Sequence, residues 1–209
     1  MKHVEGPITK YTELLARKEI VLHHLTGKIL DIGCGEGELL IKATLLGHDI
    51  TGMDRSKKEL EIAHATAKIS NVKIKTINSD IDNMEFAPET FDVVIMGEII
   101  EHLLDPFEDV KRVLEIIKPG GKLIITTPSG FAHFDSDHKN FFFTAIEGDI
   151  LNKLWVFEIL GGNFKYCKVI VVEKFFSMFG YEHTIQEMTY GNSNHPSLDF
   201  FITIKKVKQ

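Results

Sequence analysis

The chain of 209 residues is predicted to be a single α/β domain, built on a Rossmann-like, doubly wound seven-stranded sheet that is mostly parallel with a C-terminal antiparallel strand. Three features predict this fold. Five short apolar runs alternate with helical stretches through residue 127, a glycine-rich turn follows the first run, and only a short polar loop separates the last two runs. Right-handed crossovers make the first five strands parallel, whereas the short final connection makes its two strands antiparallel.

The N-terminal quarter is predicted to form an opening helix and one β-α-β unit. Apolar side chains recur at helical spacing within residues 1–26, the N-terminal helical segment, and Gly27 can end that helix in the left-handed conformation. The apolar runs at 28–32 and 49–53 predict the first two strands. A helical stretch that reaches Gly47 connects them.

The next units lead to the centre of the sheet. Ser56 and Glu59 form a capping-box sequence, in which each side chain satisfies a backbone donor of the other residue, so a helix is expected to begin there and to run to about residue 70. Residues 72–77 are predicted as the third strand. The uninterrupted apolar run FDVVIM, residues 91–96, is typical of a strand buried on both faces and is the predicted central strand.

A further helix and a fifth strand complete the parallel part of the sheet. Asp105 is suited to cap a helix that has Pro106 in its first turn, and Pro119-Gly120-Gly121 is expected to end that helix. Residues 122–127 are the predicted fifth strand. The expected buried stripe of the helix comprises Phe107, Val110, Val113, Leu114 and Ile117.

The part of the chain beyond Pro128 is predicted to complete the sheet around an insertion. Residues 145–166 are interpreted as this insertion, whose aromatic side chains either belong to the core or form a cap over the substrate. The other elements expected here are helices near 146–157 and over 169–179, the second closed by Gly180, and strands near 183–190 and 198–205.

Composition indicates an ordinary globular protein. Apolar residues make up 44% of the chain and charged residues 26%, which is unlike a disordered protein. The formal charge of −6 argues against binding nucleic acid by neutralising phosphates. No apolar run is long enough to cross a bilayer, no secretory signal is recognised, and Cys34 and Cys167 are too few for a disulfide framework. We therefore expect a cytoplasmic protein that acts on a small molecule. A homodimer is a further expectation.

A glycine-rich turn directly after the first strand is the clearest functional motif. Asp31, Gly33, Gly35 and Gly37 have the spacing D-x-G-x-G-x-G, whereas dinucleotide-binding turns have G-x-G-x-x-G. Glycines let the backbone turn sharply and approach a ligand closely. A pyrophosphate needs donors without nearby negative charge, but the amino and carboxylate groups of a methionine tail need an acceptor and donors together. Asp31 and the loop amides can supply both.

The segment ILDIGCGEGEL, residues 29–39, resembles motif I of the class I S-adenosylmethionine-dependent methyltransferases, and the resemblance extends over about residues 27–127. It implies a Rossmann-like fold, methyltransferase activity and S-adenosyl-L-methionine as the cofactor. The resemblance also implies that Asp54 accepts hydrogen bonds from the ribose hydroxyls and that Asp80 and the Ile81 amide meet the adenine ring. The implied cofactor-binding residues are Asp31, Gly33, Cys34, Gly35, Gly37, Asp54, Arg55, Asp80, Ile81 and Gly97.

A second group of polar residues follows the central strand. Glu98, Glu101 and His102 are spaced i, i+3 and i+4, so they share one face if the segment is helical. The resemblance places Glu98 near the sulfonium, and the loop with His133 and His138 should reach the same edge of the sheet. A neutral imidazole can accept a proton from a hydroxyl, although transfer from a sulfonium can also proceed by alignment alone. The catalytic candidates are Glu98, His102 and His138.

This group leaves the acceptor and the use of a metal open. The pattern E-x-x-E-H resembles the small-RNA 3′-terminal 2′-O-methyltransferases, in which a metal grips the terminal ribose; its ligands here would be Glu98, Glu101, His102 and His138. A GEIIEHLLDP-like segment is also typical of the ubiquinone-pathway O-methyltransferase-like group, where it implies no metal. We predict O-methylation of a small molecule without a metal. The alternatives are RNA 2′-O-methylation and a non-catalytic cofactor-binding module.

Overall fold

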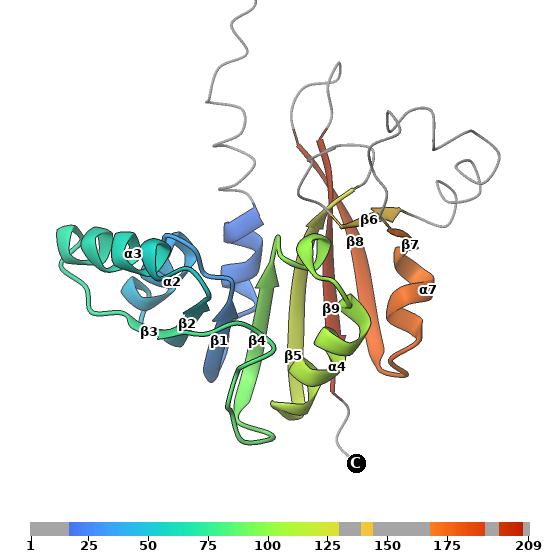
Figure 1. The fold of residues 1–209 in the computed structure, drawn as a ribbon, viewed down its shortest axis with the longest axis horizontal. Coiled ribbons are helices and arrows are strands. Elements are labelled where there is room, and N and C mark those ends of the chain that lie inside the picture. Colours follow the sequence, from blue (N-terminus) through green and yellow to red (C-terminus); the bar gives the residue numbers. More distant parts are fainter. Residues whose placement is uncertain (1–16, 130–138, 144–167, 191–196, 207–209) are drawn as a thin grey trace, which may run out of the picture.

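The structure, a computed structural model, describes residues 17–129, 139–143, 168–190 and 197–206 (Figure 1). Several predicted features lie outside the described residues, namely most of the opening helical segment, His133, His138 and the insertion at 145–166 with its helix. The first described residues, 17–23, are helical as predicted. In the part of the chain that the structure describes, no helix is both long and apolar enough to cross a membrane.

A seven-stranded sheet forms the centre of the molecule, with the strand order β3-β2-β1-β4-β5-β9-β8 (Figure 1). Strands β1 to β5 are parallel, and β9 is antiparallel to both β5 and β8. The predicted fold class is therefore confirmed, together with the antiparallel pair at the C-terminus. The strands are β1 Lys28–Ile32, β2 Asp49–Asp54, β3 Lys75–Asn78, β4 Phe91–Gly97, β5 Ile117–Pro128, β8 Glu182–Tyr190 and β9 Ser197–Lys205.

Helices cover both faces of the sheet, because successive residues of a buried strand point to opposite sides. Ile29 and Val93 belong to one hydrophobic cluster, whereas their neighbours Leu30 and Val94 belong to another. The first cluster includes residues of the N-terminal helix and of α2, and the second includes residues of α4 and α7. These helices are α2 Glu38–Leu45, α4 Pro106–Glu115 and α7 Val172–Ser177.

The helix starts show where the capping predictions hold. Helix α3, Lys57–Ile69, begins after Ser56, whose Oγ accepts a hydrogen bond from Glu59 N at 3.3 Å. The second half of the predicted capping box is replaced, because Ser56 N donates to Asp54 Oδ1 at 2.8 Å. Helix α4 begins after Asp105, whose side chain caps its first turn as predicted.

The Pro119-Gly120-Gly121 sequence lies inside β5 and does not end α4, which corrects the prediction. Helix α4 ends at Glu115 and β5 begins at Ile117, so Ile117 belongs to the strand. The register between β4 and β5 shifts across the tripeptide, which forms a bulge. A Cβ at Gly121 would lie 2.7 Å from the carbonyl oxygen of Asp92, so glycine is needed at this close approach.

The region predicted as one helix over 169–179 begins as a strand, which is a second correction. Strand β7, Lys168–Val171, pairs in parallel with β6, Asn140–Phe143, in a separate two-stranded sheet, and α7 follows only after it. Neither β6 nor β7 was predicted. A short apolar run rich in β-branched residues is compatible with a buried helix as well as with a strand. Gly180 follows α7 with a φ of +69°, in keeping with the predicted stop.

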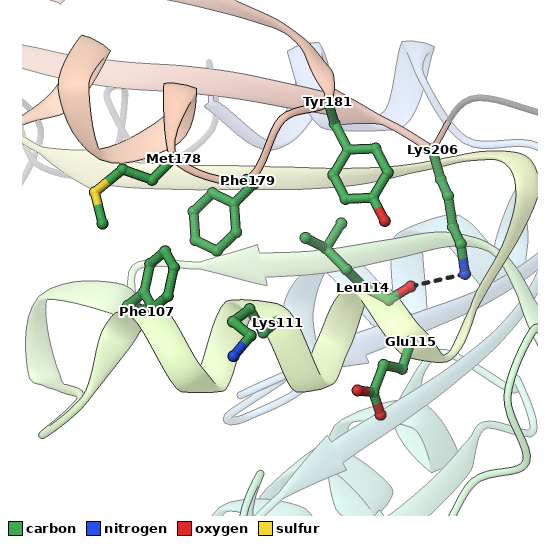
Figure 2. A pocket seen from close by; sticks show the side chains of 8 residues that line it. All are labelled: Phe107, Lys111, Leu114, Glu115, Met178, Phe179, Tyr181 and Lys206. Carbon is green, nitrogen blue, oxygen red and sulfur yellow. Dashed lines mark hydrogen bonds between the residues drawn. The ribbon is translucent and has the colours of Figure 1, made fainter.

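Helices α4 and α7 pack through aromatic rings next to a hollow of about 310 Å³ (Figure 2). Phe107 of α4 stacks on Phe179 at a centroid distance of 4.8 Å. Elsewhere in the hollow, Lys206 Nζ donates a hydrogen bond to Leu114 O at 3.2 Å and so satisfies the carboxyl end of α4 (Figure 2). None of the residues that line this hollow belongs to the predicted cofactor site.

Candidate active site at the carboxyl ends of the strands

Three predicted cofactor-binding residues lie at the carboxyl ends of neighbouring strands. Asp31 is the penultimate residue of β1, Asp54 ends β2 and Gly97 ends β4. Strand β1 lies between β2 and β4, so these three ends are adjacent. The strand order reverses direction between β1 and β4, which is the place where open α/β sheets bind their ligands. The structure therefore brings the predicted residues together at one edge of the sheet.

The turn after β1 requires glycine for two different reasons. Gly33, Gly35 and Gly37 all have positive φ, between +50° and +78°, where other residues are strained. A Cβ at Gly33 would in addition lie 2.5 Å from Ile99 Cγ2. A Cβ at Gly35 would meet no described atom within 4 Å. Packing thus requires Gly33, whereas Gly35 borders open space that a ligand can occupy.

Four amides of this turn are already used inside the protein. Gly33 N and Cys34 N donate to Met53 O at 2.7 and 3.1 Å, which ties the turn to the end of β2. Gly35 N donates to Asp54 Oδ2 at 2.8 Å, and Gly37 N donates to Cys34 O at 2.9 Å. These amides fix the shape of the turn. Their predicted use as donors to a ligand carboxylate stays a prediction.

Asp54 is the best oriented of the predicted side chains. Its Oδ1 accepts a hydrogen bond from Ser56 N and its Oδ2 accepts one from Gly35 N, both at 2.8 Å. Two amides from different segments therefore fix the plane of the carboxylate. Each carboxylate oxygen can accept a second hydrogen bond, so the half-buried group can still receive two hydroxyl donors at once.

Asp31 is buried beneath the turn, with 4% of its surface exposed. Its pKa is raised to about 7, chiefly by burial; the charge of Lys18 opposes the rise, and the charge of Asp54 adds to it. The ionised form of Asp31 is thus disfavoured in the protein alone. A cationic group bound beside it would favour ionisation, which is the electrostatic property expected of a residue that receives an ammonium group.

The remaining predicted cofactor-binding side chains surround this edge in different ways. Asp80 Oδ1 accepts hydrogen bonds from Asn83 N at 2.9 Å and from Asn83 Nδ2 at 2.7 Å, so it also shapes the turn after β3. Ile81 is buried and Arg55 is exposed. Whether these residues contact the cofactor stays a prediction.

Cys34 has a packing role that the structure makes explicit. A Cβ at Gly52 would lie 2.7 Å from Cys34 Sγ, so the thiol fills the space left by that glycine. Burial and the charges of Asp31 and Asp54 raise the pKa of the thiol well above its ordinary value. The side chain is therefore protonated at neutral pH.

The segment after β4 does not meet the condition for a shared helical face. Glu98 has a positive φ of 55°, and only Ile100–His102 form a helical turn, of the 3₁₀ type. The side chain of Glu101 is 2% exposed, whereas those of Glu98 and His102 are 31% and 39% exposed. A non-glycine residue with positive φ is strained, and such strain is common beside functional sites. Glu98 occupies this position directly after Gly97.

Glu101 points into the protein and is coupled to Glu98. Its Oε2 accepts a hydrogen bond from Thr127 Oγ1 at 3.1 Å. Burial raises its pKa well above the ordinary value, and the charge of Glu98 raises it further. His102 Nε2 lies 4.0 Å from Glu101 Oε1, which is beyond hydrogen-bond distance. Two neighbouring carboxyl groups, of Glu98 and Glu101, therefore follow β4 directly.

Two residues at this edge were missed by the sequence analysis. Arg17 Nη1 forms an ion pair with Glu98 Oε2, which joins the N-terminal helix to the end of β4. Asn140 is buried, and its Nδ2 donates to Ile100 O at 3.1 Å and to Leu103 O at 2.7 Å. Among the described residues, neither Glu98 Oε1 nor Asn140 Oδ1 has a hydrogen-bond partner, although both atoms are buried. No sequence spacing indicates these contacts.

The predicted catalytic and metal-binding sets both include His138, which lies outside the described residues. Within the described ranges, no three His, Cys, Asp or Glu side chains are grouped closely enough to hold a metal ion. The structure thus brings Glu98 and Glu101 together and places His102 nearby, and the contribution of His138 stays a prediction.

Comparison with known proteins matches residues 30–125 to a family described as a methyltransferase domain. A ubiquinone biosynthesis O-methyltransferase of Aliivibrio fischeri is 31% identical over 143 residues, which cover 66% of this chain and 58% of the relative. The enzyme of the same name in Cereibacter sphaeroides is 35% identical over 109 residues, which cover 50% of this chain and 44% of the relative. The chain thus spans about half the length of the curated relatives it matches.

Among solved structures, a SAM-dependent methyltransferase from Methanosarcina mazei has a similar fold. The two superpose with a TM-score of 0.66 over 91% of this chain and 98% of the other, at 17% sequence identity. At this identity the likeness concerns the fold alone.

Proposed function

We propose that the chain is a class I S-adenosylmethionine-dependent methyltransferase that methylates an oxygen atom of a small molecule; its residues 30–125 match a family described as a methyltransferase domain. The observation that carries this proposal is the Asp54 carboxylate. Two backbone amides hold it at the end of β2, with capacity for two further donors. The named function of the relatives supports oxygen as the acceptor atom.

In this proposal the carboxyl edge supplies one acidic group for each hydrogen-bond-donating part of the cofactor. We assign Asp54 to the ribose hydroxyls, Asp31 to the methionine ammonium and Asp80 to the exocyclic amine of adenine. Asp31 and Asp54 lie at neighbouring strand ends. The open space at Gly35 lets the backbone approach the ligand without a side chain between them.

The acceptor is assigned to the segment after β4. When bound, S-adenosylmethionine supplies an electrophilic methyl group, and its transfer to a hydroxyl oxygen releases the hydroxyl proton. Glu98 Oε1 is a buried acceptor without a described partner, so it suits a hydrogen bond from that hydroxyl. The half-exposed imidazole of His102 can pass the proton to solvent. Arg17 holds the other Glu98 oxygen and so orients the carboxylate.

Isothermal titration with S-adenosylmethionine tests the assignment of Asp54. Asp54→Ala should weaken binding by about 100-fold, because it removes two charge-assisted hydrogen bonds and releases the turn. The matched control is Asp49→Ala at the opposite end of β2, where the exposed carboxylate pairs with Lys75 and binding should not change. Equal affinity of Asp54→Ala and the unaltered protein would contradict the assignment.

Transfer of a labelled methyl group to a panel of phenols and catechols tests the acceptor class. Nuclear magnetic resonance of the product should place the label on oxygen. A label on nitrogen or carbon would overturn that part of the proposal, and formation of S-adenosylhomocysteine with any acceptor would eliminate a non-catalytic module. Cytoplasmic location and a homodimer stay predictions, the second testable by analytical ultracentrifugation.

A metal-dependent RNA 2′-O-methyltransferase is the second candidate, favoured by one observation. Glu98 Oε1 is buried without a described hydrogen-bond partner, and the charge of Glu98 acts on the neighbouring Glu101. Two carboxylates can be part of the ligand set of a divalent ion, to which His102 and His138 would add. Elemental analysis of the purified protein and methylation of RNA 3′ ends with and without a chelator distinguish the candidates, because activity that resists the chelator removes this one.

A further inference from the structure

A hollow of about 550 Å³ lies at the amino ends of the parallel strands, opposite the edge that holds the proposed cofactor site. We name it the basal pocket. Its lining includes His24, Thr26, Asp92, Lys122, Thr203 and Lys205. These residues come from the end of the N-terminal helix, the start of β4, the bulged part of β5 and the end of β9. The volume is typical of a small-molecule site.

Two lysines of the basal pocket face each other across neighbouring strands. Lys122 of β5 is the direct register partner of Lys205 in the antiparallel strand β9. Like charges placed directly opposite each other destabilise a sheet. Lys205 Nζ lies 3.9 Å from Glu182 Oε2, but both side chains are more than 60% exposed, so this pair is weak. Lys122 forms no ion pair with any described residue.

Burial disfavours the charged forms of two basic groups in the basal pocket. Burial lowers the pKa of Lys122. Burial also lowers the pKa of His24, and the charge of Lys122 lowers it further. The acid in the pocket, Asp92, is already engaged: its Oδ2 accepts from Lys118 Nζ and from Lys28 N, both at 2.8 Å. Thus Lys118 offsets the charge of Asp92, Lys205 has only its weak pair with Glu182, and Lys122 has no ion pair with a described residue.

Neutral donors lie beside these cations. The hydroxyls of Thr26 and Thr203 belong to the same lining, and Thr203 Oγ1 shares a hydrogen bond of 2.6 Å with Thr184 Oγ1. Hydroxyl and ammonium donors together match an oxyanion, which offers several acceptor oxygens and negative charge. This cationic group occurs in a chain whose formal net charge is −6.

We propose that the basal pocket binds a small oxyanion, and that the natural ligand is a phosphate-bearing metabolite. The phosphate would lie between the side chains of the register partners Lys122 and Lys205 and would supply the negative charge that the partly buried Lys122 lacks. The remaining volume would hold the organic part of the molecule. This site is separate from the cofactor edge, so its occupation is independent of the proposed methyl transfer.

Titration with inorganic pyrophosphate at constant ionic strength tests the proposal on the full chain. The unaltered protein should bind pyrophosphate by isothermal titration and should melt at a higher temperature in its presence. Lys122→Gln and Lys205→Gln should each weaken this binding at least tenfold, and Lys122→Arg should retain it. The matched control is Lys57→Gln, whose exposed side chain lies on α3 and which should bind as the unaltered protein does.

The protein without pyrophosphate gives a second readout. Lys122→Gln should melt at a higher temperature than the unaltered chain, because the partly buried ammonium group is gone, and it should bind S-adenosylhomocysteine with unchanged affinity. No binding of pyrophosphate, or equal binding by Lys122→Gln and Lys57→Gln, would overturn the proposal. Binding of a DNA oligonucleotide but not of pyrophosphate would also overturn it. If Lys122→Gln does not fold, Lys205→Gln and Lys122→Arg decide the same question.

Discussion

The carboxyl and amino edges of the parallel sheet carry opposite charges, but both bury those charges without full compensation. At the carboxyl edge, burial raises the pKa of Asp31 and of Glu101. At the amino edge, burial lowers the pKa of Lys122. In each case the charged form is disfavoured chiefly because burial removes it from water. A cationic ligand can therefore stabilise one edge and an anionic ligand the other, and each edge is less stable alone than it could be.

The largest expected effect is on Asp31. Its pKa is about 7 in the folded chain and near 3.8 in an exposed carboxyl, so the folded state retains the proton between these values. Stability therefore falls as the pH rises through this window, and the loss is complete above pH 7. Asp31→Asn should raise the free energy of unfolding at pH 8 by up to about 4 kcal/mol, and by nearly nothing near pH 4.

Urea unfolding at both pH values checks this gain, and Asp49→Asn is the control because that carboxylate is exposed. The same Asp31→Asn protein should bind S-adenosylmethionine more weakly, since the acceptor for its ammonium is neutral. A protein that is less stable at pH 8 would show that Asp31 is compensated in the folded chain, and the comparison of the two edges would then fail.

The next effect concerns the buried support of the carboxyl edge. Asn140→Ala removes the donor to the carbonyl groups of Ile100 and Leu103 in a buried site, so it should lower the free energy of unfolding by about 2–3 kcal/mol. Asn78 makes the same kind of paired contact, to Asp54 O and Arg55 O, but on the surface. Asn78→Ala should therefore cost only about 0.5 kcal/mol. If chemical denaturation gave equal losses of unfolding free energy for Asn140→Ala and Asn78→Ala, burial would not explain the importance of Asn140.

The pH dependence of cofactor binding gives a third test of the carboxyl edge. If ionised Asp31 receives the ammonium group, protonation competes with binding below its pKa of about 7. The dissociation constant should then rise about tenfold for each pH unit between 7 and 5.5, and level off above pH 7. Titration calorimetry in buffers of different ionisation enthalpy should also detect proton release. Asp31→Asn should flatten this profile, and a flat profile in the unaltered protein would exclude the role of Asp31.

The sequence predicted the carboxyl edge better than the elements around it. The sequence of β1 and its turn has a single interpretation, because an apolar run is followed by glycines that allow the chain to turn sharply. By contrast, Pro119-Gly120-Gly121 fits a helix end as well as a bulge, and only the approach of the Asp92 backbone selects the bulge. Strand β7 has the same ambiguity, because β-branched apolar residues suit a buried helix or a strand.

The contacts of the site were less predictable than its location. Arg17 and Glu98 are 81 residues apart in the sequence, and Asn140 reaches Ile100 across 40 residues. Such contacts depend on how helices and loops return to the strand ends, and no local spacing encodes that. Glu98, Glu101 and His102 show the same limit, since their local pattern fits a helix but the chain forms a single 3₁₀ turn.

The smallest expected effect is at the amino edge and concerns Asp92. The hydrogen bond from Lys118, then that from Lys28 N, lowers the pKa of this carboxyl, so its stabilisation is present above pH 4 and is lost as the pH falls further. Because the group is partly exposed, Asp92→Asn should lower the free energy of unfolding by less than about 1 kcal/mol at pH 7.

The Asp92→Asn substitution also removes the negative charge of the basal pocket and releases Lys118. Affinity for pyrophosphate should therefore rise about threefold to fivefold by calorimetry. Asp49→Asn is the control, because its carboxylate pairs with Lys75 at the amino end of β2 but outside the basal pocket. An unchanged or weaker affinity of Asp92→Asn would show that the amino edge does not attract anions. Only the carboxyl edge would then carry charge that a ligand can compensate.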